Sequence, residues 1–214
     1  GLDWRNLEKF IYQDKCRTHC HRCAYGCPFG AKWNARMYLE QAVESGAKLL
    51  VNAKVSRVLT QHNRAIGVEF SCQGKTEQLR ANNIVLAAGG IGTPRILTAS
   101  GVAGAGTDYF VDPVIAVMGA VDDIESHGEV PMAAGMHLPE QGIMLSDLAL
   151  PKPLFQLFAA QVGRVDRLSA HARTLSIMVK VKDQLGGSIG PKWLSKQLCA
   201  GDKSKLDTGV TIAK

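Results

Sequence analysis

The segment at residues 84–94 limits the fold of this chain more than any other stretch. Residues 84–88 form a continuous apolar run, Ile-Val-Leu-Ala-Ala, which is typical of a strand buried on both faces of a parallel sheet. Gly89-Gly90 follows, and Thr93-Pro94 supplies a good N-cap and first residue for a helix that we expect to end near Ala99. A strand, a glycine turn and a helix in this order predict an α/β fold.

The same glycine turn is a candidate nucleotide-binding site. Glycine at the end of a strand lets a ligand approach the backbone closely. The first turn of the following helix offers free N–H groups at the positive end of the helix dipole, and nucleotides bind at this position in open α/β sheets. On this segment alone, a tight turn without a ligand fits equally well.

Periodic patterns before this unit predict a helix followed by a β-meander. Apolar positions at helical spacing predict a helix over residues 33–45, which Gly46 ends. Short β-like runs follow, with a turn at His62-Asn63 and another at residues 73–75. The expected strands lie at residues 48–51, 55–59, 65–70 and 76–80.

The composition changes after Gly101, and a second type of structure is expected there. The sequence predicts a strand over residues 110–121. Residues 174–182 alternate between apolar and polar side chains, which predicts a strand with one solvent-exposed face. Five prolines between residues 113 and 153 predict irregular structure over residues 122–168.

Composition and charge weigh against two classes of protein. Hydrophobic residues make up 46% of the chain, and no stretch approaches the roughly 20 apolar residues of a membrane-spanning helix. The net charge is +6, but the basic residues near the C-terminal end alternate with acidic ones and lack an aromatic stacking pattern, so a solvated face is favoured over a nucleic-acid interface. These residues are Lys192, Lys196, Lys203, Lys205, Asp183, Asp202 and Asp207.

Four of the six cysteines lie close together at the N-terminal end, at Cys16, Cys20, Cys23 and Cys27. Their spacing, with Pro28 after the last, is similar to the cysteine run of bacterial ferredoxins. Four thiolates on short loops suit a [4Fe–4S] cluster or a tetrahedral Zn²⁺, and free thiols that pack a loop are the open alternative. A tight cluster also favours a reducing, cytoplasmic setting over a secreted disulfide scaffold.

Several motifs together resemble the glucose–methanol–choline (GMC) oxidoreductase family. Residues 93–102, with Thr-Pro, Ile-Leu and Ser-Gly-Val in register, resemble the family's second signature. Residues 27–33, 55–58 and 65–69 resemble the segments that precede it. The resemblance implies part of a Rossmann-like FAD-binding domain with a β-meander in residues 1–104. It further implies part of an antiparallel-sheet substrate domain in residues 105–214.

The resemblance also implies cofactor contacts. The backbone of Val55 is expected to contact the adenine of FAD, and the dinucleotide path is expected to be lined by Ala88, Gly89, Gly90 and Thr93. Members of the family bind the pyrophosphate at an N-terminal G-x-G-x-x-G turn and take the alcohol proton with a histidine near the C-terminus. This chain shows neither motif, so no catalytic residue is assigned to it. We expect Gly1 and the last five residues of the sequence to be internal positions of a longer protein.

The function implied is oxidation of the CH–OH group of a small alcohol by hydride transfer to flavin. Electrons would then pass through the cysteine cluster to an acceptor protein or a quinone. Two other functions stay open. One is a different flavoprotein dehydrogenase or reductase with two dinucleotide-binding domains. The other is a non-enzymatic module that uses four cysteines for metal binding or electron transfer.

Overall fold

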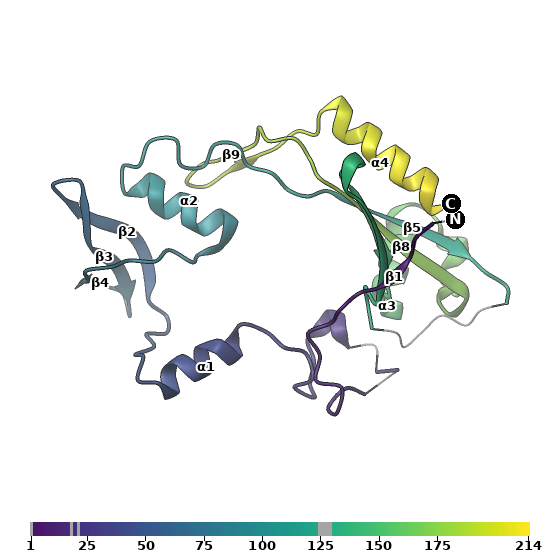
Figure 1. Ribbon diagram of the computed structural model, residues 1–214, viewed down its shortest axis with the longest axis horizontal. Helices are drawn as coiled ribbons and strands as arrows, with labels where there is room; N and C mark the ends of the chain where they lie inside the picture. The colour runs from purple at the N-terminus through teal and green to yellow at the C-terminus, as the bar shows by residue number, and fades with distance from the viewer. Residues whose placement is uncertain (1, 18, 21, 124–129) are drawn as a thin grey trace. The chain divides into compact units, whose positions relative to one another are not determined.

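The computed structural model describes residues 2–17, 19–20, 22–123 and 130–214 (Figure 1). Helices and antiparallel sheets are mixed along the chain, which confirms the predicted α/β (α+β) class with a partial FAD-binding architecture. The chain divides into two compact units. The first contains residues 1–41, 112–183 and 199–214, and the second contains residues 42–111 and 184–198. The proposed border between domains at residue 104 stays a prediction.

The first unit is built on a five-stranded antiparallel sheet (Figure 1). The strand order is β1-β6-β7-β8-β5, and every neighbouring pair is antiparallel. The predicted alternating strand at residues 174–182 is confirmed as β8. The strands are β1 (Arg5–Asn6), β5 (Val114–Ala120), β6 (Ala134–Leu138), β7 (Ile143–Asp147) and β8 (Thr174–Val181).

Helix α4 (Ala200–Ala213) packs on one face of this sheet, against β7 and β8. The Cys199 sulfur accepts from the Asp202 amide at 3.4 Å, and the Asp202 carboxylate accepts from the Cys199 amide at 3.0 Å, so the helix begins with a capping box. Gly209 lets helix α4 lie close to β8, because a Cβ at this position would collide with a methyl group of Val179. Ile143 and Val179 below the helix are fully buried.

The prediction of irregular structure over residues 122–168 is wrong. This stretch contains β6, β7 and helix α3 (Lys152–Gln161), with Phe155 and Ala159 of the helix buried. The prolines lie at the borders of these elements. Pro139 opens the short helix η2 (Pro139–Gln141), and Pro151 precedes α3. Proline has no backbone N–H, but at these positions no hydrogen bond of a strand or helix requires one. The other short helices are η1 (Cys23–Tyr25), η3 (Val165–Arg167) and η4 (His171–Arg173).

The second unit contains the predicted β-meander, which is confirmed as β2 (Lys54–Gln61), β3 (Arg64–Cys72) and β4 (Lys75–Arg80). Two-residue turns join the strands. His62 and Asn63 in the first turn, and Gln73 and Gly74 in the second, all have positive φ. Positive φ at both central residues gives the turn a twist that matches the twist of the strands, so these turns fix the register of the hairpins.

Helix α1 (Arg36–Glu44) confirms the helix predicted over residues 33–45. A short hairpin of β9 (Ser188–Ile189) and β10 (Leu194–Ser195) completes the second unit, where it lies near helix α2 (Gly89–Ala99). Among the helices of the described residues, none is long and apolar enough to cross a membrane.

The prediction of a buried strand at residues 84–88 is wrong for this structure. The run is extended but pairs with no strand of the described residues, and Val85 is 88% exposed. A strand becomes buried only when neighbours cover both of its edges and faces, and the described residues supply none here. The run predicted as a strand at residues 48–51 likewise forms no ladder.

Candidate functional site

The first candidate site is the N-terminal end of α2. The helix begins at Gly89, four residues before the predicted N-cap at Thr93, so Pro94 lies inside the helix. Thr93 still stabilises this end, because its Oγ1 accepts a hydrogen bond from the Ala88 amide at 3.1 Å. Ala88, Gly89 and Gly90 are exposed and Thr93 is half-buried. The structure therefore brings four of the five predicted cofactor residues to one helix end.

The backbone at this helix end is open to a ligand. Gly89 has φ of 76°, a conformation that favours glycine. Apart from the adjoining residues and the backbone of the helix itself, no atom of the described residues lies within 4 Å of the position that a Cβ would take at Gly89 or at Gly90. The first turn carries no acidic side chain. An anionic group could thus approach the free N–H groups of the helix without meeting protein atoms or negative charge.

Val55, the fifth predicted residue, lies on β2 and is half-buried. The register of the β2–β3 pairing shifts next to Val55. Val55 pairs with Phe70, whereas Arg57 pairs with Glu69. This leaves Ser56 as the extra residue of a β-bulge. Bulges bend a strand and redirect its side chains, and they are frequent beside binding sites. Reasoning from the sequence missed the bulge.

Helix α2 is fixed to the meander at its other end. Ser100 Oγ accepts a hydrogen bond from the Val58 amide at 2.8 Å and donates to the Ile96 carbonyl at 2.6 Å. Arg95 donates from Nε to the Gly190 carbonyl at 3.1 Å, which holds the β9–β10 hairpin on the helix. The glycine end of α2 is therefore carried by a helix with two independent anchors. This open, uncharged end on a fixed helix fits the phosphates of a dinucleotide.

The cysteines occupy a closed loop in the first unit. An antiparallel bridge joins Ile11 to Lys32, and the Tyr12 amide donates to the Ala31 carbonyl at 2.8 Å, so the loop between them holds all four predicted ligands. Each of them is a half-buried free thiol, at Cys16, Cys20, Cys23 and Cys27.

Two of these thiols have shifted pKa values. Partial burial raises the pKa of Cys23, and the neighbouring thiols of Cys20 and Cys16 add to the shift. The pKa of Cys27 is lowered by backbone N–H groups that hydrogen-bond to its sulfur; they belong to Lys32, Phe29, Ala31 and Gly30. The thiols thus lie near enough for their charges to interact. However, no three or more His, Cys, Asp or Glu side chains among the described residues are arranged to hold a metal ion.

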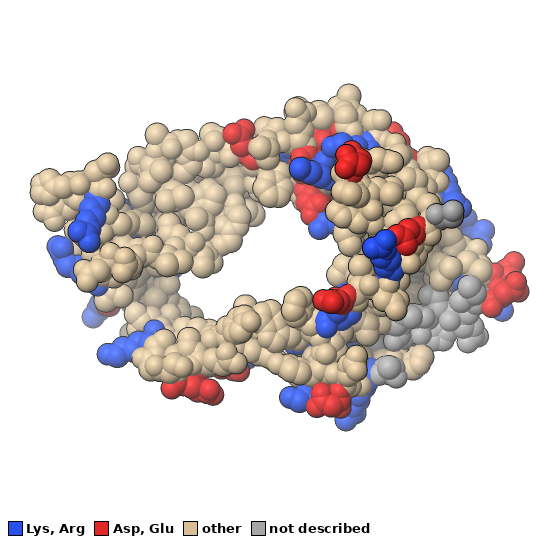
Figure 2. Space-filling model, in the orientation of Figure 1, with Lys and Arg blue, Asp and Glu red and all other residues tan. Residues whose placement is uncertain are grey.

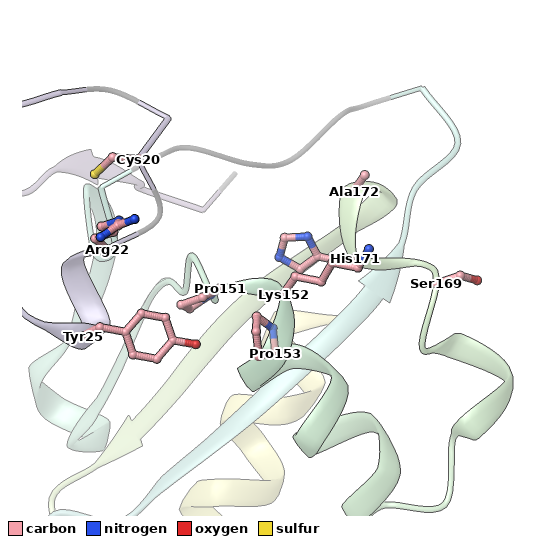
Figure 3. A pocket seen from close by; sticks show the side chains of 9 residues that line it. All are labelled: Cys20, Arg22, Tyr25, Pro151, Lys152, Pro153, Ser169, His171 and Ala172. Carbon is pink, nitrogen blue, oxygen red and sulfur yellow. The ribbon is translucent and has the colours of Figure 1, made fainter.

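A hollow of ≈590 Å³ lies beside this loop and was not predicted from the sequence (Figure 3). Residues from the loop, from the start of α3 and from in and around η4 line it, so its parts lie up to 152 positions apart in the chain and no local pattern could reveal it. The lining residues of the described chain are Cys20, Arg22, Tyr25, Pro151, Lys152, Pro153, Ser169, His171 and Ala172.

The described histidines show structural rather than catalytic environments. His19 and His62 have positive φ in turns or loops, and His137 is exposed on β6. A ring nitrogen of His171 forms a hydrogen bond of 2.7 Å with the Leu150 carbonyl, and the ring meets Phe155 edge-on. Acidic and basic side chains are interspersed on the face shown in Figure 2, as expected of a solvated surface.

A family model described as GMC oxidoreductase matches residues 1–116 of the chain. The match covers the cysteine loop, the meander and the glycine end of α2. An uncharacterized GMC-type oxidoreductase of Mycobacterium tuberculosis is 36% identical over 128 residues, which cover 58% of this chain and 20% of that protein.

Two further relatives have names that state an activity. The long-chain-alcohol oxidase FAO1 of Arabidopsis thaliana is 24% identical over 229 residues, covering 92% of this chain and 30% of that protein. The mitochondrial choline dehydrogenase of Homo sapiens is 27% identical over 186 residues, covering 86% of this chain and 26% of that protein. The chain therefore spans less than a third of the length of each of these three relatives.

Proposed function

The chain belongs to the GMC oxidoreductase family, and on that basis we propose that it forms part of an FAD-dependent enzyme that oxidises the CH–OH group of a small alcohol. The observation that carries the proposal is the open glycine end of α2 within the segment matched to the family. The names of two relatives, an alcohol oxidase and a choline dehydrogenase, support an alcohol as the substrate class.

In this proposal FAD is held by backbone groups of the second unit. The free N–H groups of the first turn of α2 bind the phosphates, and Gly89 and Gly90 leave room for the close approach. Thr93 keeps the Ala88 amide in place, and the bulged strand presents the backbone of Val55 to the adenine. The bound flavin supplies the acceptor for the hydride of the alcohol C–H bond.

We assign no proton acceptor within this chain. His171, which lines the hollow of the first unit, already bonds the Leu150 carbonyl. The described part of the chain thus contributes binding and positioning.

Anaerobic reduction of the flavin tests the proposal. The intact protein that contains this chain should purify with FAD, and its flavin absorbance should bleach when a primary alcohol or choline is added without oxygen. A protein that binds no FAD would contradict the proposal, and a flavin that only NADH reduces would favour another class of flavoprotein.

A metal site in the cysteine loop is a second proposal. It rests on the sequence spacing of the four half-buried thiols and on the bridge from Ile11 to Lys32 that closes their loop, and metal binding would have to draw together thiols that are not gathered into a metal-holding group in the described residues. A [4Fe–4S] cluster fits the spacing of the four cysteines better than zinc does. Iron, sulfide and zinc analysis of protein purified without oxygen decides between the two metals and a metal-free loop.

A further inference from the structure

The hollow beside the cysteine loop has the properties of a ligand site that the flavin function does not use. Its volume of ≈590 Å³ falls within the range of roughly 300–1,000 Å³ found for small-molecule pockets. It lies wholly within the first compact unit, whereas the glycine end of α2 lies in the second. Figure 3 shows Arg22 and Tyr25 on one side of it and the start of α3 with His171 on the other.

The lining carries positive charge. Arg22 and Lys152 are exposed, and none of the other described lining residues is acidic. Neither cation forms an ion pair with a carboxylate in the described part of the chain. The positive end of the α3 dipole lies at the same wall, because Lys152 is the first residue of that helix. The hollow therefore favours an anion.

The rest of the lining is uncharged, largely apolar and partly rigid. Pro151 and Pro153 contribute rings whose backbone φ is fixed, and Tyr25 faces them across the hollow in Figure 3. His171 is held by the Leu150 carbonyl, so this wall keeps its shape. A flat apolar body fits between such rings, while hydroxyl groups of Tyr25 and Ser169 add hydrogen-bonding capacity.

We propose that this hollow binds a small molecule in which a phosphate or carboxylate group is attached to a flat apolar body. The oxyanion lies between Arg22 and Lys152, and the apolar body lies against Tyr25 and the two prolines. Bidentate pairing with the Arg22 guanidinium suits either group, because both present two oxygens in one plane to its N–H groups.

Calorimetric titration of the intact protein with phenyl phosphate, benzoate and neutral phenol tests the proposal. At least one of the two anions should bind, and phenol should bind about tenfold more weakly or not at all, since a hydrogen bond to a charged group is worth roughly one decade in affinity. The tighter of the two anions identifies the oxyanion group. Binding of phenol as tight as that of both anions, or no binding of either anion, would overturn the proposal.

Single variants locate the site. Arg22→Gln and Lys152→Gln should each raise the dissociation constant of the tighter anion about tenfold, because each removes one charged partner. Arg36→Gln, which also removes an exposed arginine of the first unit but lies outside the hollow, should leave it unchanged. Thermal melting of each variant confirms that it is folded. Unchanged affinity in both folded hollow variants would place the anion elsewhere and refute the assignment.

Discussion

The backbone amide of Ala88 donates a hydrogen bond to the Thr93 hydroxyl, 3.1 Å away, across the first turn of α2. The contact joins the apolar run at residues 84–88 to the helix that follows it. Its geometry resembles the return bond of a capping box, in which a side chain a few residues into the helix satisfies an amide at the helix start. Thr93 thus satisfies the Ala88 amide from within the helix, and the glycines between the two residues carry no side chain over the helix start.

Removing that bond should destabilise the helix start. Thr93→Val keeps the shape of the side chain but leaves the Ala88 amide without its acceptor, and we expect a loss of about 0.5–2 kcal/mol, as for other caps. Urea denaturation measures the loss. Thr93→Ser retains the hydroxyl and should remain near the wild type; equal stability of the valine and serine variants would show that the bond contributes nothing.

Alanine substitutions at two glycines of α4 should change the stability of the fold in opposite directions. At Gly209 the new methyl group would collide with Val179, and overpacking of this kind costs about 1–3 kcal/mol. At Gly201 the nearest atom, the Cys199 sulfur, would lie at an ordinary 3.6 Å, so Gly201→Ala should gain up to about 1 kcal/mol of helix propensity. A gain in melting temperature for Gly209→Ala would refute the close packing of α4 on β8.

Local patterns predicted the meander because its strands pair with their neighbours in sequence. They predicted β8 from its own alternation, although its partners β5 and β7 are distant in the chain. The turns at His62-Asn63 and Gln73-Gly74 determine the hairpins, and period-two alternation marks β8. The β6–β7 hairpin and α3 were missed, because their prolines were interpreted as breaks within the segment instead of as borders of its elements. The run at residues 84–88 was predicted as a buried strand from its composition, although burial depends on neighbours that the described residues do not supply.

The ion pair between Arg57 and Glu69 should make stability depend on pH. The Arg57 guanidinium, which lies 2.9 Å from the carboxylate, holds the pKa of Glu69 below its usual 4.5. A carboxylate with a lowered pKa stabilises the fold above its unfolded pKa, and this contribution is lost as the pH falls through the folded pKa. We expect Arg57→Gln to be modestly less stable than the wild type at pH 7.

The difference between the two proteins should shrink as the pH falls below 4.5 and through the lowered pKa of Glu69, because below that pKa the carboxylate is protonated in both proteins. Denaturant titrations at a series of pH values measure it. A difference that stays constant down to the acid transition would mean that Arg57 stabilises the strand by packing alone.

The metal proposal for the cysteine loop predicts a selective loss of metal. Protein purified without oxygen should contain iron and sulfide, and Cys23→Ser should lose most of both because it removes one of four thiolate ligands. Cys72→Ser, which changes a half-buried cysteine of β3 outside the loop, should retain them. Protein without iron, or equal metal in both variants, would contradict the proposal.

The candidate sites differ in how far the sequence could predict them. Ala88, Gly89, Gly90 and Thr93 are nearly contiguous, so one helix end gathers them and a linear motif suffices. Arg22 and Lys152 are separated by 130 positions and meet only after the cysteine loop and α3 have folded into one unit. The bulge at Ser56 depends on the pairing of two strands and has no signature in either strand alone.

The most direct test of the flavin proposal is the affinity of the Gly90→Ala protein for FAD. The described chain has room for the new methyl group, since no atom outside the adjoining residues and the helix's own backbone lies within 4 Å of its position, so a loss of affinity without a loss of stability points to the ligand. We expect the dissociation constant of FAD, measured by flavin fluorescence on the intact protein, to rise at least about tenfold with no loss of melting temperature. Gly201→Ala should bind FAD as the wild type does. Equal affinity in the Gly90→Ala protein would contradict the assignment of this helix end to FAD.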